Sequence, residues 1–232
     1  YLDLHKICSD PRPPIQFADN EGKYIFFPCG DAQYMVAETA TMKLIAKYPR
    51  PVWYRSNANA DSHPWADERA LLALMYKDSE TSYRIEIWDP VQNKKISTMN
   101  VEMPASQQRD VPSMHISPQS KYLVVMPTDG KSILSYNIDS GALVQNIKLN
   151  TPRPLTKLLD EGLFSNDDAT FFIRHDNFVE AYSLENGALI QKISNLQLLK
   201  GNVCETFCPE DRNNFAYFGE VNTFVNYYYV SD

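Results

Sequence analysis

The sequence predicts an all-β fold built from repeated units of four antiparallel strands. Two twelve-residue stretches nearly repeat each other: YNIDSGALVQNI from Tyr136 to Ile147 and YSLENGALIQKI from Tyr182 to Ile193. A second recurring element starts, at spacings of about 43 to 51 residues, at Phe17, Trp65, Ile116, Phe164 and Phe207. Self-similarity at this period indicates stacked repeats, and four short strands per repeat are typical of the blade of a β-propeller.

Both recurring elements have the pattern of β-hairpins. The duplicated stretch contains an alternating apolar segment, a polar turn and a second alternating segment. Its turns, DSG and ENG, place Gly141 and Gly187 where a hairpin needs a positive φ. The other element, such as ISPQSKYLVVM from Ile116, joins two strands through a polar turn. Because one such unit cannot bury both of its faces alone, we expect neighbouring units to stack face to face.

The units can be placed in order along one predicted propeller domain, residues 1–232. We expect blade units at about 15–48, 52–101, 114–149, 159–195 and 203–230. Residues 1–10 are interpreted as a strand that could pair with the last unit and close a ring, because closure removes exposed strand edges. Two interpretations stay open: a closed five-blade ring, or part of a larger propeller completed by sequence or a partner outside this chain.

The last stretch, from Phe224 to Asp232, is apolar on both faces of the expected strand. This pattern is expected of a strand that lies between two blades. A stacking platform for single-stranded nucleic acid would also use aromatic residues, but it would need a basic groove beside them. We therefore predict a core strand.

Two stretches carry a resemblance to a known family: ISPQSKYL, from Ile116 to Leu123, and the single Trp-Asp pair, Trp88–Asp89. On these residues the units resemble divergent WD-repeat (WD40-like) blades over essentially the whole chain. We assign Tyr136, Tyr182 and Met35 to the Trp88 position in their own units. No Gly-His dipeptide precedes a first strand, which departs from the pattern of the family.

The resemblance also implies a structural role for acidic residues in the turn before the third strand. These residues are Asp31, Asp129 and Asp176. In WD repeats such an aspartate helps to hold its loop through hydrogen bonds. We expect only that role here.

The charge and the apolar stretches of the chain indicate which kinds of partner it binds. The net charge is −7, from 29 acidic and 22 basic residues, whereas binding to nucleic acid depends on clustered Lys and Arg. The most apolar stretch, ALLALMY from Ala70 to Tyr76, is far too short to cross a bilayer. The N-terminus lacks the pattern of a signal peptide, so we expect an excised domain or a processed piece.

The chain has four cysteines, Cys8, Cys29, Cys204 and Cys208. Their spacing lacks the paired CxxC or Cys-His pattern of a zinc site. We therefore expect buried reduced thiols and no metal, which favours an intracellular protein, cytoplasmic or nuclear.

Candidate catalytic groups are few. Asp160, Glu161 and Glu205 fall on expected channel-lining strands, where two carboxylates could serve a glycosidase. His115 has no nucleophile motif around it and is expected to be structural. No Gly-rich phosphate loop is present, so we expect no cofactor.

The segment from Tyr54 to Glu68 departs from the repeat and lengthens its unit. Long loops on rigid scaffolds are favoured recognition sites, and exposed aromatic and arginine residues supply binding energy. The expected partner-binding residues lie in this loop and in two connections between units: Arg55, His63, Trp65, Arg109 and Arg153.

Together these patterns favour a non-enzymatic scaffold that presents loops to other proteins in a complex. One alternative is a five-bladed glycoside-processing enzyme, and another is a propeller subunit of a ribonucleoprotein or translation assembly. Direct binding of nucleic acid and insertion into a membrane are not expected. The oligomeric state is not encoded in any pattern that we recognise.

Overall fold

The computed structural model describes residues 3–12, 16–17, 22–31, 33–49, 54–58, 69–103, 112–117, 119–127, 129–152, 162–165, 167–175, 178–194, 215–221 and 224–230 of the chain. These residues form antiparallel β-strands and one short 3-10 helix, η1 (Leu4–Lys6). The predicted all-β class is confirmed. Within the described residues, no helix is long and apolar enough to cross a membrane.

The strands follow one another in simple order within four sheets of four strands and one hairpin. Sheet A contains β1 (Gln16–Phe17), β2 (Tyr24–Cys29), β3 (Gln33–Glu38) and β4 (Leu44–Pro49). Sheet B contains β5 (Tyr54–Ala58), β6 (Leu72–Lys77), β7 (Ser82–Asp89) and β8 (Lys94–Glu102). Sheet C contains β9 (Ser113–Ile116), β10 (Tyr122–Met126), β11 (Ser132–Asn137) and β12 (Leu143–Lys148). Sheet D contains β13 (Gly162–Phe164), β14 (Thr170–Arg174), β15 (Phe178–Ser183) and β16 (Leu189–Ser194), and the hairpin contains β17 (Phe215–Val221) and β18 (Phe224–Val230).

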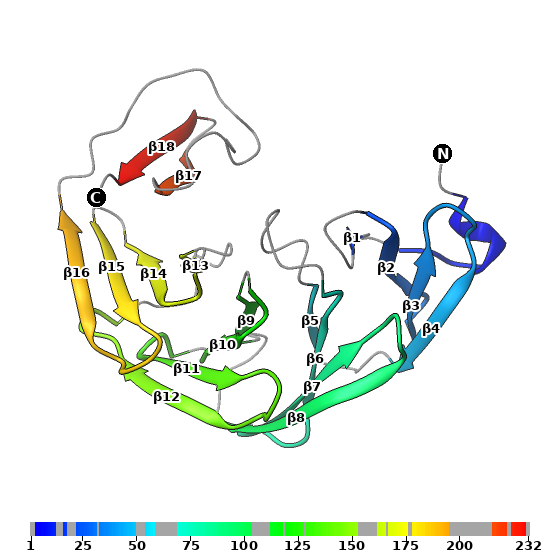
Figure 1. The fold of residues 1–232 in the computed structure, drawn as a ribbon, viewed down its shortest axis with the longest axis horizontal. Coiled ribbons are helices and arrows are strands. Elements are labelled where there is room, and N and C mark those ends of the chain that lie inside the picture. The colour runs from blue at the N-terminus through cyan, green and yellow to red at the C-terminus, as the bar shows by residue number, and fades with distance from the viewer. Residues whose placement is uncertain are drawn as a thin grey trace.

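The sheets lie side by side around an open arc (Figure 1). The first strand of each four-stranded sheet lies towards the inside of the arc, and the fourth strand lies on its outer rim. The inner strands β5 and β9 of neighbouring sheets contact each other. None of the sheets formed by the described strands closes on itself.

Both faces of the inner sheets are apolar, because each face packs against a neighbouring sheet. In β6, Leu72 and Leu74 join a cluster with residues of sheet A, whereas Ala73 and Met75 join a cluster with residues of sheet C. A third cluster joins sheets C and D, with Val124 and Phe171 both fully buried. Burial of one such Leu or Phe side chain stabilises a fold by roughly 1.5–3 kcal/mol. Stacking of the sheets therefore accounts for most of the core.

The third and fourth strands of all four sheets are joined by the same turn. These turns comprise residues 38–43, 89–94, 137–142 and 183–188. The fifth residue of each turn has a positive φ: Met42 58°, Asn93 49°, Gly141 68° and Gly187 74°. In the duplicated stretches, the amides of Gly141 and Gly187 donate to the carbonyls of Asn137 and Ser183, both at 2.9 Å. The two predicted hairpins are confirmed by the pairing of β11 with β12 and of β15 with β16.

A register shift just before each turn shows which residues are equivalent. The shifts fall between Ile87 and Trp88, Ser135 and Tyr136, Ala181 and Tyr182, and Val36 and Ala37. Tyr136 and Tyr182 therefore occupy the Trp88 position, as predicted. The prediction for Met35 is wrong, because Ala37 occupies this position in sheet A. Sheet A has no aromatic residue at this position to mark the register. Met35 lies two residues before Ala37 and therefore on the same face of the strand, so the alternation of apolar residues does not distinguish between them.

The N-terminal segment is not the strand that was expected over residues 1–10. Leu4–Lys6 form η1, and the spacing of Leu4, Ile7 and Cys8 places all three on the face that meets sheet A. Cys8 forms a disulfide with Cys29 at the end of β2, with a Cα–Cα distance of 5.8 Å. The expectation of reduced thiols is therefore wrong for this pair, which the fold brings together across 21 residues. Cys204 and Cys208 lie outside the described residues.

At the other end of the chain, β17 and β18 pair in antiparallel register from Phe215↔Val230 to Val221↔Phe224. Strand structure over Phe224–Val230 is thus confirmed. The packing of its side chains between two blades stays a prediction, as does the single domain over residues 1–232.

Replacement of a turn glycine by alanine tests the stacking of sheets at the turns. A Cβ atom on Gly141 would lie 2.7 Å from the carbonyl oxygen of Thr98 in the preceding sheet, whereas one on Gly187 would lie 3.4 Å from the flexible Gln145 side chain. Gly187→Ala should cost about 1–2 kcal/mol because of its positive φ alone. Gly141→Ala should cost about 1–3 kcal/mol more, because of the steric clash with backbone. Urea unfolding of both variants measures the difference, and equal losses would contradict close contact at Gly141.

Candidate functional site

One end of the four-stranded sheets carries the turns between the first and second strands and between the third and fourth strands. We call this end the turn face, defined by the turns 38–43, 89–94, 117–122, 137–142, 165–170 and 183–188. The long segment that follows β5 joins a first strand to a second strand. The end of β5 and the start of β6 therefore lie at the turn face, whereas residues 59–68 are outside the described part of the chain.

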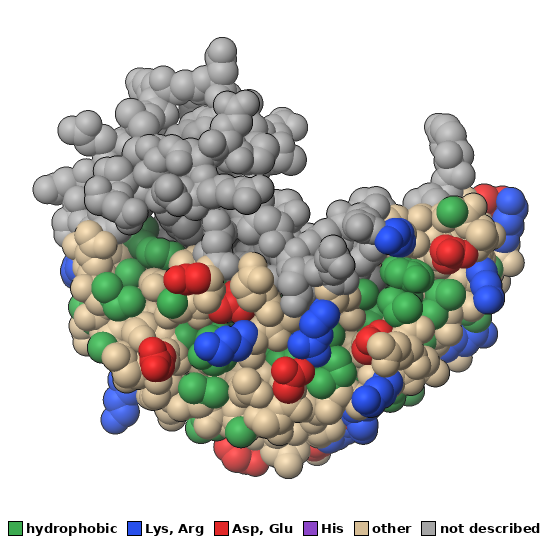
Figure 2. Space-filling view, in the orientation of Figure 1, with side chains coloured by type: hydrophobic (Ala, Val, Ile, Leu, Met, Phe, Trp, Pro, Cys, Tyr) green, Lys and Arg blue, Asp and Glu red, His purple; other side chains and the backbone are tan. Residues whose placement is uncertain are grey.

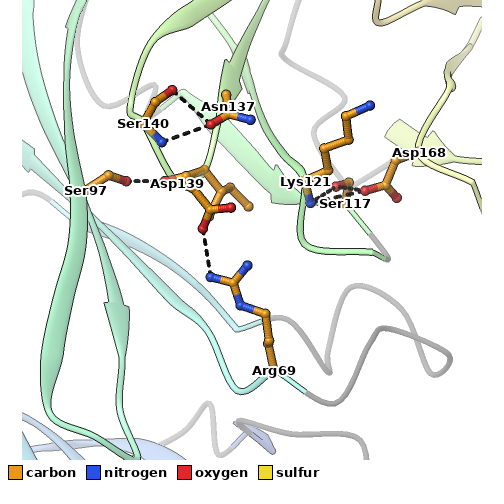
Figure 3. Close-up of polar contacts among 9 residues, drawn as sticks. Arg69, Ser97, Ser117, Lys121, Asn137, Asp139, Ser140 and Asp168 are labelled. Atoms are coloured by element: carbon orange, nitrogen blue, oxygen red, sulfur yellow. Dashed lines mark hydrogen bonds and ion pairs between the residues drawn. The ribbon is translucent and has the colours of Figure 1, made fainter.

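Sheets B and C are joined at the turn face by polar contacts (Figure 3). Arg69, which directly follows the long segment, forms an ion pair of 2.9 Å with Asp139 in the turn of sheet C. The hydroxyl of Ser97 in β8 donates to the carbonyl oxygen of Ile138. Asn137 accepts hydrogen bonds of 2.9 Å from the amide and the hydroxyl of Ser140. The base of the long segment is thus attached to a turn whose own shape is fixed.

Sheets C and D are joined at the turn face by one buried carboxylate, that of Asp168. It accepts a hydrogen bond from the hydroxyl of Ser117 and from the amides of Gln119 and Lys121, at 3.0 and 3.2 Å for the two amides. Asp168 belongs to the turn of sheet D, and all three donors belong to the turn of sheet C. Its side chain is fully buried. A carboxylate that accepts three hydrogen bonds across a junction fixes the two turns relative to each other.

Two further carboxylates, Glu86 and Glu180, lie at equivalent positions two residues before an aromatic residue. Glu86 accepts a hydrogen bond of 3.1 Å from the indole Nε1 of Trp88 and pairs with Arg84 and Lys95. Its burial is nearly complete. The paired cations offset the cost of burying its charge.

Glu180 is only 1% exposed and lies among polar groups of two sheets. It accepts a hydrogen bond of 2.8 Å from the hydroxyl of Tyr182 and one of 3.2 Å from Thr151, which follows β12. His175 Nε2 lies 3.2 Å from its Oε2. The hydrogen bond from Thr151 links Glu180 of sheet D to the segment that follows the last strand of sheet C.

Burial changes the titration of several tyrosines in the stacked sheets. It raises the pKa of Tyr136 from 10.0 to about 12. For Tyr182, burial is again the main cause of a pKa of about 12, and the carboxylate of Glu180 also raises it. These phenols therefore stay neutral in the folded chain at pH values that ionise an exposed tyrosine.

The structure tests few of the residues predicted from sequence. Arg55 lies in β5, but its side chain is not described, and the other expected partner-binding residues, His63, Trp65, Arg109 and Arg153, lie outside the described residues. The same holds for the candidate channel carboxylates Asp160, Glu161 and Glu205. Their roles stay predictions. Within the described residues, no group of three or more His, Cys, Asp or Glu side chains could hold a metal ion.

The predicted turn acids are partly described. Asp129 accepts a hydrogen bond of 3.1 Å from the amide of Lys131, in its own turn. Asp31 forms an ion pair of 2.6 Å with Arg12 of the N-terminal segment. Asp176 lies outside the described residues. His115 lies buried in β9, with its ring centre 6.5 Å from that of Phe171.

Sequence reasoning missed Asp168, which joins two sheets. When the recurring turns ISPQSKY and FSNDDATF are aligned, Asp168 corresponds to Ser120. Both residues have a positive φ, which is 60° for Asp168 and 56° for Ser120. Asn and Asp are the residue types most tolerant of that conformation. The alignment could therefore have marked the position as special, but the partner in the next sheet could not be deduced.

Exposed apolar side chains also gather at the turn face. Among the described residues, the large hydrophobic side chains that are exposed are Val91 at 42%, Leu143 at 52%, Leu189 at 36% and Ile190 at 58%. Val91 lies within a turn between the third and fourth strands, and the others lie within three residues after such a turn. Basic and acidic side chains are interspersed over the described surface in the view of Figure 2.

Comparisons with known proteins identify a shared fold. Neither a known protein family nor a curated protein matches the chain. A chain in the structure of the complex of KlAtg21 with the coiled-coil of AgAtg16 is similar over 89% of this chain and 60% of its own length, with a TM-score of 0.54 and 15% identity. Hydrazine synthase of Kuenenia stuttgartiensis is similar over 84% of this chain and 52% of its own length, with a TM-score of 0.49 and 16% identity. The chain thus spans little more than half the length of these structures.

Removal of the Asp168 charge tests the junction of sheets C and D. Asp168→Asn keeps a residue that tolerates a positive φ, but it replaces one carboxylate oxygen with an amino group, so at least one donor of sheet C loses its acceptor. We expect a loss of roughly 2–3 kcal/mol in the free energy of unfolding, typical of hydrogen bonds to a charged group. The exposed neighbour Asp167 provides the control, and Asp167→Asn should cost less than about 1 kcal/mol. Similar losses in the two variants would refute the assigned role.

The buried tyrosines predict a loss of stability in alkali. A pKa that is higher in the folded chain stabilises the fold fully below pH 10, and this contribution is lost as the pH rises from 10.0 to about 12. Tyr136→Phe should reduce the slope of this loss, measured as the free energy of urea unfolding against pH. An unchanged slope would show that Tyr136 ionises as readily in the folded chain as in the unfolded one.

Proposed function

We propose that this chain is a non-enzymatic, WD-like β-propeller scaffold whose turn face binds other proteins. Exposed apolar side chains gathered at one end of rigid sheets carry this proposal. Leu143, Leu189 and Ile190 follow equivalent turns of sheets C and D. The proposal takes these side chains as part of one apolar surface, and such surfaces mark sites of protein association.

The propeller architecture is supported by the arc of sheets with their first strands inward (Figure 1). It is also supported by the shared fold with a chain in the structure of the complex of KlAtg21 with the coiled-coil of AgAtg16. That structure contains the coiled-coil of a second protein, which is an example of a fold of this kind in a protein complex. The number of blades, in a five-blade ring or in part of a larger propeller, is left open by this proposal.

The proposed mechanism is rigid display. Asp168 holds the turns of sheets C and D together, and the Arg69–Asp139 ion pair holds the base of the long segment against sheet C. An exposed ion pair contributes little to stability, about 0–1 kcal/mol. The proposed role of the Arg69–Asp139 pair is therefore to orient the chain at Arg69 relative to sheet C. Side chains held in place before binding lose less conformational entropy when a partner arrives.

A protein partner fits the surface better than a nucleic acid does. Acidic and basic side chains alternate over the described face in Figure 2, and the whole chain carries a net charge of −7. Specific protein interfaces combine an apolar centre with a mixed polar rim. An intracellular location, cytoplasmic or nuclear, stays a prediction, and the Cys8–Cys29 disulfide removes the cysteine-based reason for it.

Substitution of the exposed apolar residues tests the proposal. The triple variant Leu143→Ser, Leu189→Ser and Ile190→Ser should fold normally, because these side chains are 36–58% exposed and lie outside the apolar clusters between the sheets. In quantitative affinity purification from the native source, stoichiometric protein partners should fall at least about tenfold, which corresponds to roughly 1.4 kcal/mol of binding free energy.

The matched control replaces exposed residues at the opposite end of the sheets, Lys77→Ser, Glu80→Ser and Lys148→Ser. These changes should leave the recovery of partners unchanged. Loss of partners in the control but not in the triple variant would place the interaction elsewhere. A protein that always purifies alone would refute the scaffold function.

A further inference from the structure

We propose that residues 3–12 form a disulfide-latched cap on the open face of sheet A, and that reduction of Cys8–Cys29 by a dithiol uncovers this face. The inference does not depend on the proposed function of the turn face. It follows from what covers each sheet of the arc.

Sheet A has two apolar faces, and among the residues that the structure describes only one of them packs against another sheet. Phe26 and Val36 point towards sheet B and join Leu72 in one cluster. On the other face, Ile25, Phe27 and Met35 are 1%, 0% and 4% exposed. Their neighbours there are Leu4 and Cys8 of the N-terminal segment rather than strands of another sheet.

The N-terminal segment thus takes the place that a neighbouring sheet takes elsewhere in the arc. Figure 1 shows it at the end of the arc, beside sheet A. Leu4 is 7% exposed and Cys8 is 3% exposed, so both side chains are inserted into the core of this end. An apolar face of a repeat unit must be covered, either by a neighbouring unit or by another segment, because it would otherwise be exposed to water.

Besides its apolar contacts with sheet A, the cap is held by a short stretch of backbone pairing. Its helix η1 has only three residues, and such short helices have little stability of their own. Its backbone contacts to sheet A include the hydrogen bonds from Gly30 N to Asp10 O, at 2.8 Å, and from Arg12 N to Pro28 O, at 3.0 Å.

The charged contacts of the cap lie at the surface. Arg12 pairs with Asp10 at 2.7 Å and with Asp31 at 2.6 Å, but all three side chains are more than 40% exposed. Ion pairs at such positions are weakened by solvent and salt. The Cys8–Cys29 bond is therefore the interaction that keeps the segment near its site whenever the non-covalent contacts open.

Opening the latch is a two-electron reduction. A thiolate of the dithiol attacks one sulfur of Cys8–Cys29, forms a mixed disulfide and releases the other cysteine as a thiolate, which takes up a proton. The second thiol of the reductant then attacks the mixed disulfide. The products are two protein thiols and an oxidised dithiol. Cys29 is the more accessible of the two cysteines, since it is only partly buried.

Hydrogen exchange with and without dithiothreitol tests the latch. The reporters are the amides of Arg12 and Gly30, whose hydrogen bonds join the cap to sheet A, and the amide of residue 8, whose hydrogen bond to Leu4 lies within the cap. The controls are the amides of Gly141 and Gly187 in sheets C and D. We expect exchange at the reporters to rise at least tenfold, roughly the effect of losing one constraint, and exchange at the controls to stay constant.

A double variant separates reduction of this disulfide from other effects of the reductant. Cys8→Ser with Cys29→Ser should show the fast exchange of the reduced protein, and dithiothreitol should cause no further change. Unchanged reporters after reduction would show that the other contacts suffice to hold the cap. Loss of protection at the controls would show that the bond supports the whole fold. Free thiols at Cys8 and Cys29 in protein purified without reductant, detected by mass spectrometry, would also overturn the proposal.

Discussion

Face-to-face stacking of four-stranded sheets is the constraint on which the rest of this structure depends. A strand such as β6 must be apolar on both sides, because Leu72 and Leu74 face one neighbour while Ala73 and Met75 face the other. No sheet of this kind is stable alone, since each would expose at least one apolar face. The hydrogen bonds of the turns, the buried carboxylates and the terminal cap all serve to align or complete this stack.

Polar groups set the geometry that apolar packing alone leaves free. Apolar contacts are not directional, so they allow neighbouring sheets to slide or rotate. Asp168 accepts hydrogen bonds from the turn of the adjacent sheet, and Glu180 accepts one from Thr151 beyond the adjacent strand. These contacts lie at opposite ends of sheets C and D. Two fixed points define the angle between sheets, and a fixed angle keeps the exposed residues of the turn face in a constant arrangement.

The same stacking rule explains why the two sides of sheet A differ. An apolar face requires a cover, and in the described part of the chain the cover of this face is a short segment rather than a sheet. A segment of ten residues offers far fewer contacts than a sheet does, so a covalent bond has a larger share in holding it. The redox state of one cysteine pair and the exposure of a large apolar face are thereby coupled. An oxidising compartment would therefore keep this face of sheet A covered, and a reducing compartment would expose it.

The sequence by itself determined the all-β class, the hairpins at Gly141 and Gly187 and the equivalence of Tyr136 and Tyr182 with Trp88. These features depend on local alternation and on turn residues, which repeat along the chain and can be compared within it. Only the tertiary structure decided the Cys8–Cys29 pair, the Asp168 contacts with the next sheet and the helical form of the N-terminal segment. Each of these depends on groups 21 to 51 residues apart or on a face supplied by another element. Met35 was misassigned for the same reason: without an aromatic marker, only the pairing with β4 reveals the register.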